Sequence, residues 1–196
     1  MNNYEKKINN HYNSLLKKRG LNTKGLGWGN GKLNLRYKIF CRHLNFKNKN
    51  ILDFGCGLGS FYKFLSSKKI FPKKFYGVEI NQSLINYIKK NYSKKILVSK
   101  KIPKKLKVDY CVSNGVHNYK IKGHKKIFYK DINDLLKVTK ICLAISFIND
   151  DVDYRENHLS YKSLFELIKF IRKKKCHYLI DQTFNKYETF VFIFKK

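Results

Sequence analysis

The sequence is poor in alanine, proline, arginine and acidic residues. Ala144 is the only alanine among 196 residues, and Pro72 and Pro103 are the only prolines. Five of the 43 basic residues are arginine, and only 13 acidic residues oppose them, so the formal net charge is +30. There is no run of about 18 apolar residues, which argues against a membrane-spanning helix. The first residues lack the apolar stretch of a signal peptide, so we expect a cytoplasmic protein.

The sequence also lacks any known cysteine spacing pattern. The five cysteines are Cys41, Cys56, Cys111, Cys142 and Cys176. An odd number without a Cys-x-x-Cys pair is typical of reduced thiols rather than of a disulfide framework or a zinc site. We therefore expect no metal centre.

Two explanations of the positive charge remain open. Lysine, asparagine, isoleucine, phenylalanine and tyrosine are abundant and have A/T-rich codons, so an A/T-rich genome explains much of the lysine. Binding of a polyanion is the alternative. The densest stretch, from Lys89 to Lys107, holds nine lysines but only Tyr92 as an aromatic residue. Groove readers prefer arginine and single-strand binders need stacking aromatics, so nucleic acid is the less favoured partner.

The most informative segment is a short apolar run followed by alternating glycines. Residues 51–54 predict a strand that contains Asp53, and Gly55, Gly57 and Gly59 follow it. A helix pattern begins directly behind them. Without side chains at the glycines, backbone N–H groups and a helix N-terminus can approach a ligand closely. This arrangement predicts the first turn of a nucleotide-binding βαβ unit.

A second acid supports this interpretation. Residues 75–79 predict a strand that ends at Glu79, 26 residues after Asp53. An acid at the tip of the second strand can accept hydrogen bonds from both ribose hydroxyls of a nucleotide. Dinucleotide-binding proteins have G-x-G-x-x-G, whereas here the third glycine follows the second after only one residue. The alternative is another Rossmann-like domain that uses the glycines only for tight turns.

The pattern D-x-G-x-G-x-G resembles the first motif of class I S-adenosylmethionine-dependent methyltransferases. The chain also resembles a group of small bacterial members of this family, whose acceptors are mostly undefined. The resemblance lies in the pairs Gly27-Trp28 and Arg36-Tyr37 and in the tail from Asp181 to Phe190. The resemblance implies S-adenosylmethionine as cofactor. The cofactor-binding residues that it and the motif imply are Asp53, Gly55, Cys56, Gly57, Gly59, Glu79, Ile80, Trp28, Arg36 and Asn114. Many relatives carry an acid after the third strand that contacts adenine, whereas this chain has Val98-Ser99-Lys100 there.

Three of these residues have simpler interpretations as well. Arg36 either pairs with the methionyl carboxylate, which a guanidinium fits bidentately, or lies on the surface. Trp28 either walls the cofactor pocket or pins the glycine-rich loop to the core. Cys56 is better explained as a small residue in a tight turn than as a nucleophile.

Strand and helix patterns alternate along the rest of the chain. Predicted strands cover residues 51–54, 75–79, 96–98, 108–113, 141–147, 177–182 and 188–194, and predicted helices cover 60–67, 82–91, 125–137 and 161–173. We predict a single α/β domain with a Rossmann-like methyltransferase fold. Its seven-stranded, mostly parallel sheet ends in an antiparallel hairpin. Residues 1–47 form a helical arm or lid, with helices over 1–19 and 33–44, and residues 48–196 form the core.

Two segments after strands are candidates for the acceptor side. Asn114, His117 and Asn118 follow the fourth strand, and His117 is the tentative catalytic base, although a pocket-wall histidine is the simpler interpretation. The acidic loop, residues 148–157, either recognises a cationic or amine-bearing acceptor or is a solvated loop paired with lysines. The Asn/Asp-Pro-Pro-aromatic signature of base-amine methyltransferases is missing.

We therefore expect methyl transfer from S-adenosylmethionine to a small-molecule acceptor. The alternative is an RNA or other macromolecule methyltransferase that uses the lysine-rich face. A degenerate cofactor-binding subunit is disfavoured by the intact Asp53, glycine loop and Glu79. The acceptor atom and the oligomeric state stay open.

Overall fold

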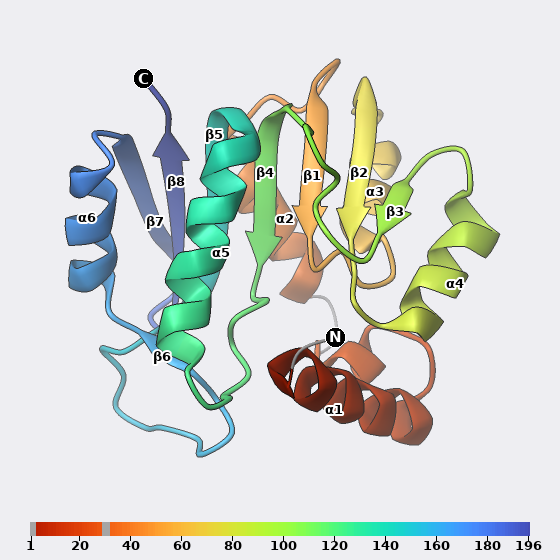
Figure 1. The fold of residues 1–196 in the computed structure, drawn as a ribbon, viewed down its shortest axis with the longest axis horizontal. Coiled ribbons are helices and arrows are strands. Elements are labelled where there is room, and N and C mark those ends of the chain that lie inside the picture. Colours follow the sequence, from red (N-terminus) through yellow and green to blue (C-terminus); the bar gives the residue numbers. More distant parts are fainter. Residues whose placement is uncertain (1–2, 29–31) are drawn as a thin grey trace. The chain divides into compact units, whose positions relative to one another are not determined.

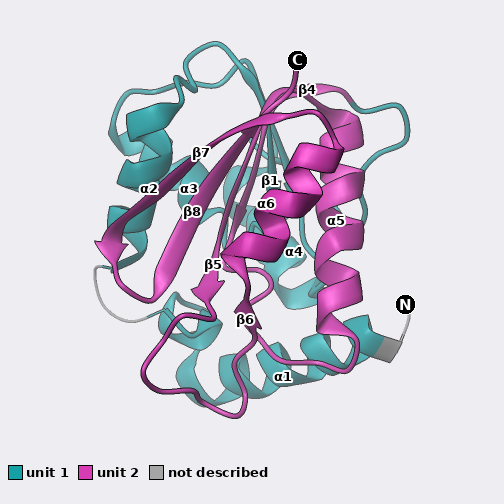
Figure 2. Cartoon of the chain, turned by 90° about the vertical axis from the view of Figure 1, so that its left-hand side faces the viewer, with its two compact units in different colours: residues 1–106 teal, residues 107–196 magenta. Residues whose placement is uncertain are grey.

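The computed structural model describes residues 3–28 and 32–196 (Figure 1). The chain divides into two compact units, residues 1–106 and residues 107–196 (Figure 2). The predicted division into an arm of residues 1–47 and a core of residues 48–196 stays a prediction. Residues 1, 2 and 29–31 of that arm lie outside the described residues.

The first unit contains three parallel strands in the order β3-β2-β1. They are β1 (Asn50–Phe54), β2 (Lys74–Val78) and β3 (Leu97–Ser99). Its helices are α1 (Asn3–Arg19), the short 3₁₀ helix η1 (Lys24–Leu26), α2 (Lys32–His43), α3 (Ser60–Ser67) and α4 (Gln82–Tyr92). Helices α3 and α4 pack side by side, with the rings of Tyr62 and Tyr92 5.9 Å apart, and α2 packs against α3 through Tyr37 and Phe61 (Figures 1 and 2). Strand β1 is buried continuously from Ile51 to Asp53 rather than in alternation, which is typical of a strand covered on both faces.

An aromatic cluster fills the core of the first unit. The ring of Phe61 on α3 lies 5.0 Å from that of Tyr37 and 5.2 Å from that of Phe46, and Phe40 and Phe75 complete the cluster at 6.1 and 6.2 Å. Phe61 itself is 1% exposed. This packing holds α2 against α3, which begins where the glycine loop ends, because aromatic pairs at these distances add to the free energy of burial.

The second unit contains five strands. They are β4 (Val108–Asn114), β5 (Thr139–Asn149), β6 (Tyr161–Lys162), β7 (His177–Asn185) and β8 (Glu188–Phe194). Strands β4 and β5 are parallel, β8 pairs antiparallel with both β5 and β7, and β6 pairs with β5. Helices α5 (His124–Val138) and α6 (Leu164–Lys173) cover the same face of these strands (Figures 1 and 2).

These elements confirm the predicted fold class: mixed α/β, mostly parallel, ending in the β7–β8 hairpin. Residues 3–28 and 32–196 form eight strands rather than the predicted seven, and the additional one, β6, corrects the predicted helix over 161–173. Tyr161 and Lys162 pair with Ile148 and Asn149 of β5. The helix begins only after Ser163, whose side chain caps it by accepting from the Glu166 N–H. No helix among the described residues is long and apolar enough to cross a membrane.

Candidate cofactor and acceptor sites

The glycine loop connects the carboxyl end of β1 to the first turn of α3. Gly57 and Gly59 have φ values of 55° and 72°, in the left-handed region that disfavours residues with a side chain. A Cβ on Gly59 would lie 2.8 Å from Ile96 Cδ1, so this position requires glycine on steric grounds as well. Gly55 N–H donates to the Val78 carbonyl across 2.8 Å, which joins the loop to the end of β2.

Glu79 lies directly against this loop. Its side chain is buried, with the residue 8% exposed, and Oε2 accepts from Gly57 N–H at 3.0 Å. Oε1 accepts from Asn81 N–H at 2.8 Å. Burial raises the pKa of Glu79, while the hydrogen bonds from the Asn81, Gly57 and Ile80 amides act in the opposite direction. A carboxylate oxygen can accept more than one hydrogen bond, so both oxygens retain capacity for ribose hydroxyls.

Asp53 is the second buried acid at the loop, at 5% exposure. Burial raises its pKa from 3.8 to about 7, and the charge of Glu79 adds to the shift. Cys56 is buried as well, and burial together with the charges of Asp53 and Glu79 raises the pKa of its thiol well above 9.0. A thiol held neutral in this way is a packing group rather than a nucleophile, and its Sγ lies 2.7 Å from the position of a Cβ on Gly77.

The N-terminal arm contacts the same loops from three places. Leu26 of η1 packs on the glycine loop, since a Cβ on Gly57 would lie 2.9 Å from Leu26 Cδ1. Asn9 Nδ2 on α1 donates to the Ile80 carbonyl at 3.4 Å. Asn81 Nδ2 donates to Asn13 Oδ1 at 2.7 Å. Helix α1 therefore lies at the carboxyl ends of β1 and β2, as Figure 1 also shows.

Trp28 and Arg36 contact each other. The guanidinium carbon of Arg36 lies 4.6 Å from the centre of the Trp28 ring, and Nη1 donates to the Lys32 carbonyl at 3.2 Å. Arg36 is 7% exposed, so it is not a surface arginine. This stacking is compatible with both roles considered for Trp28, which either pins the glycine-rich loop to the core or forms a wall of the cofactor pocket.

The adenine region after β3 has no carboxylate. Ser99 instead uses its hydroxyl to close a turn, with Oγ donating to the Lys101 carbonyl at 2.7 Å. The Ser99 carbonyl accepts from the Glu79 N–H at 3.0 Å. The Ser99 side chain, which stands where many relatives carry the acid, is therefore engaged with its own turn.

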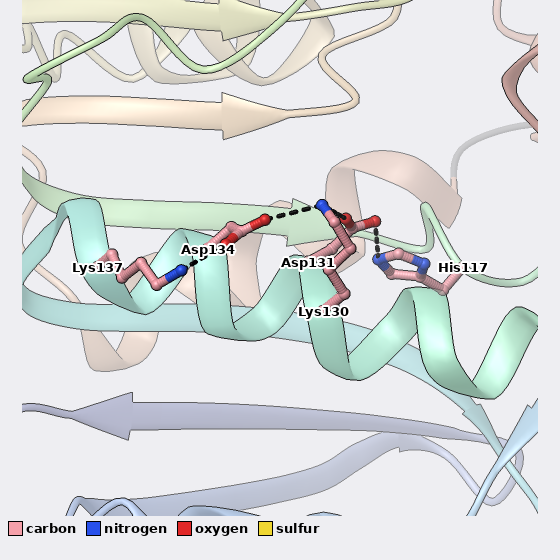
Figure 3. Close-up of polar contacts among 5 residues, drawn as sticks. All are labelled: His117, Lys130, Asp131, Asp134 and Lys137. Atoms are coloured by element: carbon pink, nitrogen blue, oxygen red, sulfur yellow. Dashed lines mark hydrogen bonds and ion pairs between the residues drawn. The ribbon is translucent and has the colours of Figure 1, made fainter. Parts of the chain in front are cut away.

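In the second unit, His117 lies in the loop that follows β4, facing α5. Its Nε2 is 3.7 Å from Oδ2 of Asp131, which belongs to a charged row with Lys130, Asp134 and Lys137 (Figure 3). Burial, with a smaller contribution from the charge of Lys162, lowers the pKa of His117 to about 3. An imidazole with this pKa stays neutral at physiological pH.

The His117 loop and the segment that follows the acidic loop are held together. Lys162 Nζ donates to the His117 carbonyl at 3.0 Å and to Ser160 Oγ at 2.5 Å. Asn118 Oδ1 accepts from the Ile148 N–H at 3.2 Å. Burial lowers the pKa of Lys162 to about 8. Asn114, at the end of β4, accepts from the Ser146 hydroxyl at 2.8 Å.

The acidic loop is paired in part with basic side chains. Lys186 contacts Asp153, and the Arg155 guanidinium donates to the Asp150 carbonyl at 2.7 Å. Asp151 and Glu156 are exposed. Both interpretations of this loop, acceptor recognition and a solvated acidic turn, remain compatible with these contacts. The described residues contain no group of three or more metal-ligating side chains.

Sequence reasoning missed Leu26, Asn9, Asn13 and Asn81 as residues around the glycine loop. Asn81 carries a signal, because it directly follows the strand and its acid and starts a helix pattern, which is typical of an N-cap. Its Oδ1 accepts from the amides of Ser83 and Leu84. Asn9 and Asn13 carry none, since an asparagine in an amphipathic helix does not reveal its partner.

No protein-family model and no curated protein matches the sequence. Magnesium protoporphyrin IX methyltransferase (ChlM) from Synechocystis with bound SAM superposes with a TM-score of 0.73 at 14% identity, over 100% of this chain and 99% of that one. A SAM-dependent methyltransferase from Aquifex aeolicus gives 0.60 at 18% identity over 85% and 93%. The methyltransferase domain of bacterial Hen1 gives 0.60 at 16% identity over 82% and 97%.

The chain has the fold of class I SAM-dependent methyltransferases. This confirms the resemblance drawn from the glycine motif at the level of the fold. In the class I methyltransferase fold, the first unit of this chain supplies the glycine loop, and the second unit supplies the reversed C-terminal hairpin. At these sequence identities the similarity concerns the fold only, and it assigns no role to an individual residue.

Proposed function

We propose that the chain binds S-adenosylmethionine at the glycine loop and transfers its methyl group to a small-molecule acceptor. The observation that carries the proposal is the position of Glu79, a buried carboxylate fixed by the Gly57 and Asn81 amides at the tip of β2. Adjacent glycines with left-handed backbone leave room for a ligand close to the main chain. The residues present therefore fit the cofactor.

Each part of the chain has a distinct task in this proposal. Glu79 accepts from the ribose hydroxyls, and the loop of Gly55, Gly57 and Gly59 passes along the methionyl part. Asp53 offers a carboxylate to the cofactor's ammonium group, and Arg36 offers its guanidinium to the carboxylate. The cofactor supplies an activated sulfonium methyl group when bound. The protein's contribution is alignment, which is worth up to about 7–11 kcal/mol in favourable cases.

The small-molecule acceptor is favoured because the chain lacks the base-amine signature and because its acidic loop offers charge to an amine-bearing acceptor. ChlM is named for a small molecule, magnesium protoporphyrin IX. Hen1, in contrast, has been solved within an RNA repair complex. An RNA or other macromolecular acceptor is the second candidate, and the excess of basic residues favours it.

We propose a cytoplasmic location because all five cysteines are free thiols.

The test uses S-adenosylmethionine that carries a labelled methyl group. The protein is first titrated with the cofactor by calorimetry and is then incubated with a bacterial extract separated into small-molecule, RNA and protein fractions. Label in the small-molecule fraction is the expected result. Label in RNA or protein would establish the second candidate, and absence of cofactor binding would refute the assignment of the glycine loop. A Glu79→Ala variant run in parallel controls for label that enters without the site.

A further inference from the structure

The two units have nearly the same density of lysine but differ sharply in acids. Residues 1–106 contain 22 lysines and three acids, whereas residues 107–196 contain 16 lysines and ten acids. A codon effect acts on both halves alike, so it accounts for the lysine and not for the missing carboxylates. Of the three acids in the first unit, Asp53 and Glu79 are buried and Glu5 is half-buried. The surface of the first unit is therefore positive almost without local compensation.

In the second unit, several lysines have carboxylate partners. Lys125 pairs with Glu166 at 2.6 Å, and Lys130 pairs with Asp134 at 2.8 Å. Such exposed pairs add little to stability, but they reduce the local potential. Because the lysines of the first unit have few acidic residues near them, we expect a polyanion to be attracted mainly to the first unit.

One site on the first unit combines lysines with an exposed aromatic ring. The turn between α3 and β2 carries Lys68, Lys69, Lys73 and Lys74, all exposed, around Phe71, which is 56% exposed. Phe71 offers an accessible ring face flanked in sequence by four cations, a combination that is complementary to a partner with negative charge and planar apolar groups.

The backbone holds this turn next to the segment that leads into β1. Asn48 N–H donates to the Phe71 carbonyl at 3.0 Å, and Lys73 N–H donates to the Lys49 carbonyl at 2.9 Å. Exposed Lys47 is thereby brought to the same edge. We call the group of Lys47, Lys68, Lys69, Phe71, Lys73 and Lys74 the lysine–phenylalanine patch. Five of its six residues lie in the stretch 68–74, and the fold adds Lys47 from a segment about 20 residues away.

We propose that the lysine–phenylalanine patch binds single-stranded nucleic acid, with its lysines on the phosphates and a base stacked on Phe71. Stacking on an aromatic side chain requires an accessible base face, which single strands offer and duplexes do not. Lysine without arginine contacts phosphates and does not read base edges bidentately, so binding is independent of sequence. An anionic membrane is less suited, because stable attachment takes a larger apolar face than one ring on a turn.

The patch lies at the amino ends of β1 and β2, whereas the glycine loop follows the carboxyl end of β1 (Figure 1). Five strand residues span about 17 Å, so a docked strand and the cofactor occupy different places. The inference therefore goes beyond the proposed methyl transfer and does not depend on the identity of the acceptor. It assigns a docking function to the first unit.

The experiment measures fluorescence anisotropy of labelled twelve-residue oligouridylate and oligothymidylate without cofactor. Phe71→Ala is expected to weaken binding roughly 5- to 100-fold, the equivalent of one stacked base, and Phe71→Trp to restore it. The two oligonucleotides separate RNA from DNA as the source of the strand. Inorganic polyphosphate, which has charge but no bases, should bind the wild type and Phe71→Ala equally.

The lysines are tested by salt dependence with a matched control. The fourfold variant K68Q/K69Q/K73Q/K74Q should reduce the slope of log K against log salt by about 3, as expected for four lost contacts to single-strand phosphates. The variant K94Q/K95Q/K104Q/K105Q removes the same charge from exposed positions of the same unit and should leave the slope nearly unchanged. Each fourfold set includes one residue with positive φ, Lys69 or Lys105.

Three results would overturn the proposal. The first is unchanged affinity of Phe71→Ala for both oligonucleotides, and the second is an equal loss of slope in the two fourfold variants. The third is Phe71-dependent binding to vesicles rich in phosphatidylserine without binding to either oligonucleotide, which would assign the patch to a membrane surface. Calorimetry of S-adenosylmethionine on Phe71→Ala should give wild-type affinity, so failure of the docking proposal is distinguishable from failure of the cofactor proposal.

Discussion

Asn81 and Asn13 join the start of α4 to α1 by a hydrogen bond, with Asn81 Nδ2 donating to Asn13 Oδ1 across 2.7 Å. Asn81 also caps α4 and donates its N–H to Glu79, so one residue connects the arm, the helix and the acid at the tip of β2. Because Asn81 is 1% exposed, loss of Asn13 would leave its amide without that acceptor in a buried place.

The arm should respond to the cofactor. Hydrogen exchange in peptides that cover residues 20–36 should slow when S-adenosylmethionine is added, because Leu26 and Trp28 then order over the bound ligand. Asn13→Ala should speed exchange of α1 and lower cofactor affinity, by an amount consistent with about 1–3 kcal/mol for a buried amide left unpaired. Asn10→Ala, on the exposed side of α1, is the control. Equal exchange with and without cofactor would contradict a lid.

Glu79 should carry much of the cofactor affinity. Glu79→Ala removes the acceptor for both ribose hydroxyls, and each charge-assisted hydrogen bond is worth about 1.5–3 kcal/mol, so calorimetry should show a loss of roughly 10²-fold or more. Glu79→Gln keeps the side-chain volume and one acceptor oxygen, so its cofactor affinity should lie between those of the wild type and Glu79→Ala. Glu166→Gln, an exposed glutamate of α6, serves as control. Unchanged affinity in Glu79→Ala would exclude the ribose role.

Asp53 should make stability depend on pH. Burial raises its pKa from 3.8 to about 7, so between these values the folded protein holds a proton that the unfolded chain has released. The free energy of unfolding therefore falls as pH rises from about 4 to about 7, by up to about 4 kcal/mol for this group. Asp53→Asn should flatten this part of the curve in urea titrations at pH 4–8. Asp134→Asn is the control with the opposite sign, because hydrogen bonds from lysines lower the pKa of Asp134.

The same group should couple cofactor binding to proton release. If Asp53 faces the ammonium group of S-adenosylmethionine, the positive charge lowers its pKa, so binding should tighten between pH 6 and 8. Calorimetry in buffers of different ionisation enthalpy measures the protons released. If the wild type and Asp53→Asn release the same number of protons on cofactor binding, Asp53 does not face the ammonium group of the cofactor.

His117 should act on acceptor binding more than on the chemical step. With a pKa of about 3 its imidazole is a weak base, so His117→Ala should raise the acceptor KM and change kcat only a few-fold. Loss of a general base would instead lower kcat by roughly 10²–10⁴-fold with cofactor affinity unchanged. His177→Ala, exposed on β7, is the control. Steady-state kinetics with the acceptor identified by methyl labelling distinguishes the two roles.

The sequence determined the order of the elements and the kind of fold. The glycine spacing, the acid that ends the second strand and the alternation of strand and helix patterns are local properties, because a left-handed turn or a buried strand is encoded by the residues that form it. The start of α6 was missed because Tyr161 fits the apolar period of the helix that follows, while the pairing of Tyr161 and Lys162 with β5 depends on a segment 13 residues away.

Only the tertiary structure decided which distant side chains meet. The contacts of Asn9, Asn13 and Leu26 with the cofactor loops, the stacking of Arg36 on Trp28, and the lowered pKa values of His117 and Lys162 all depend on packing between separate elements. In the patch around Phe71, whose other residues are neighbours in sequence, the tertiary structure adds Lys47 through the backbone hydrogen bonds between the two segments. Composition fixes how many charges the chain carries, but burial and proximity fix their pKa values and partners, and neither is a property of a local stretch of sequence.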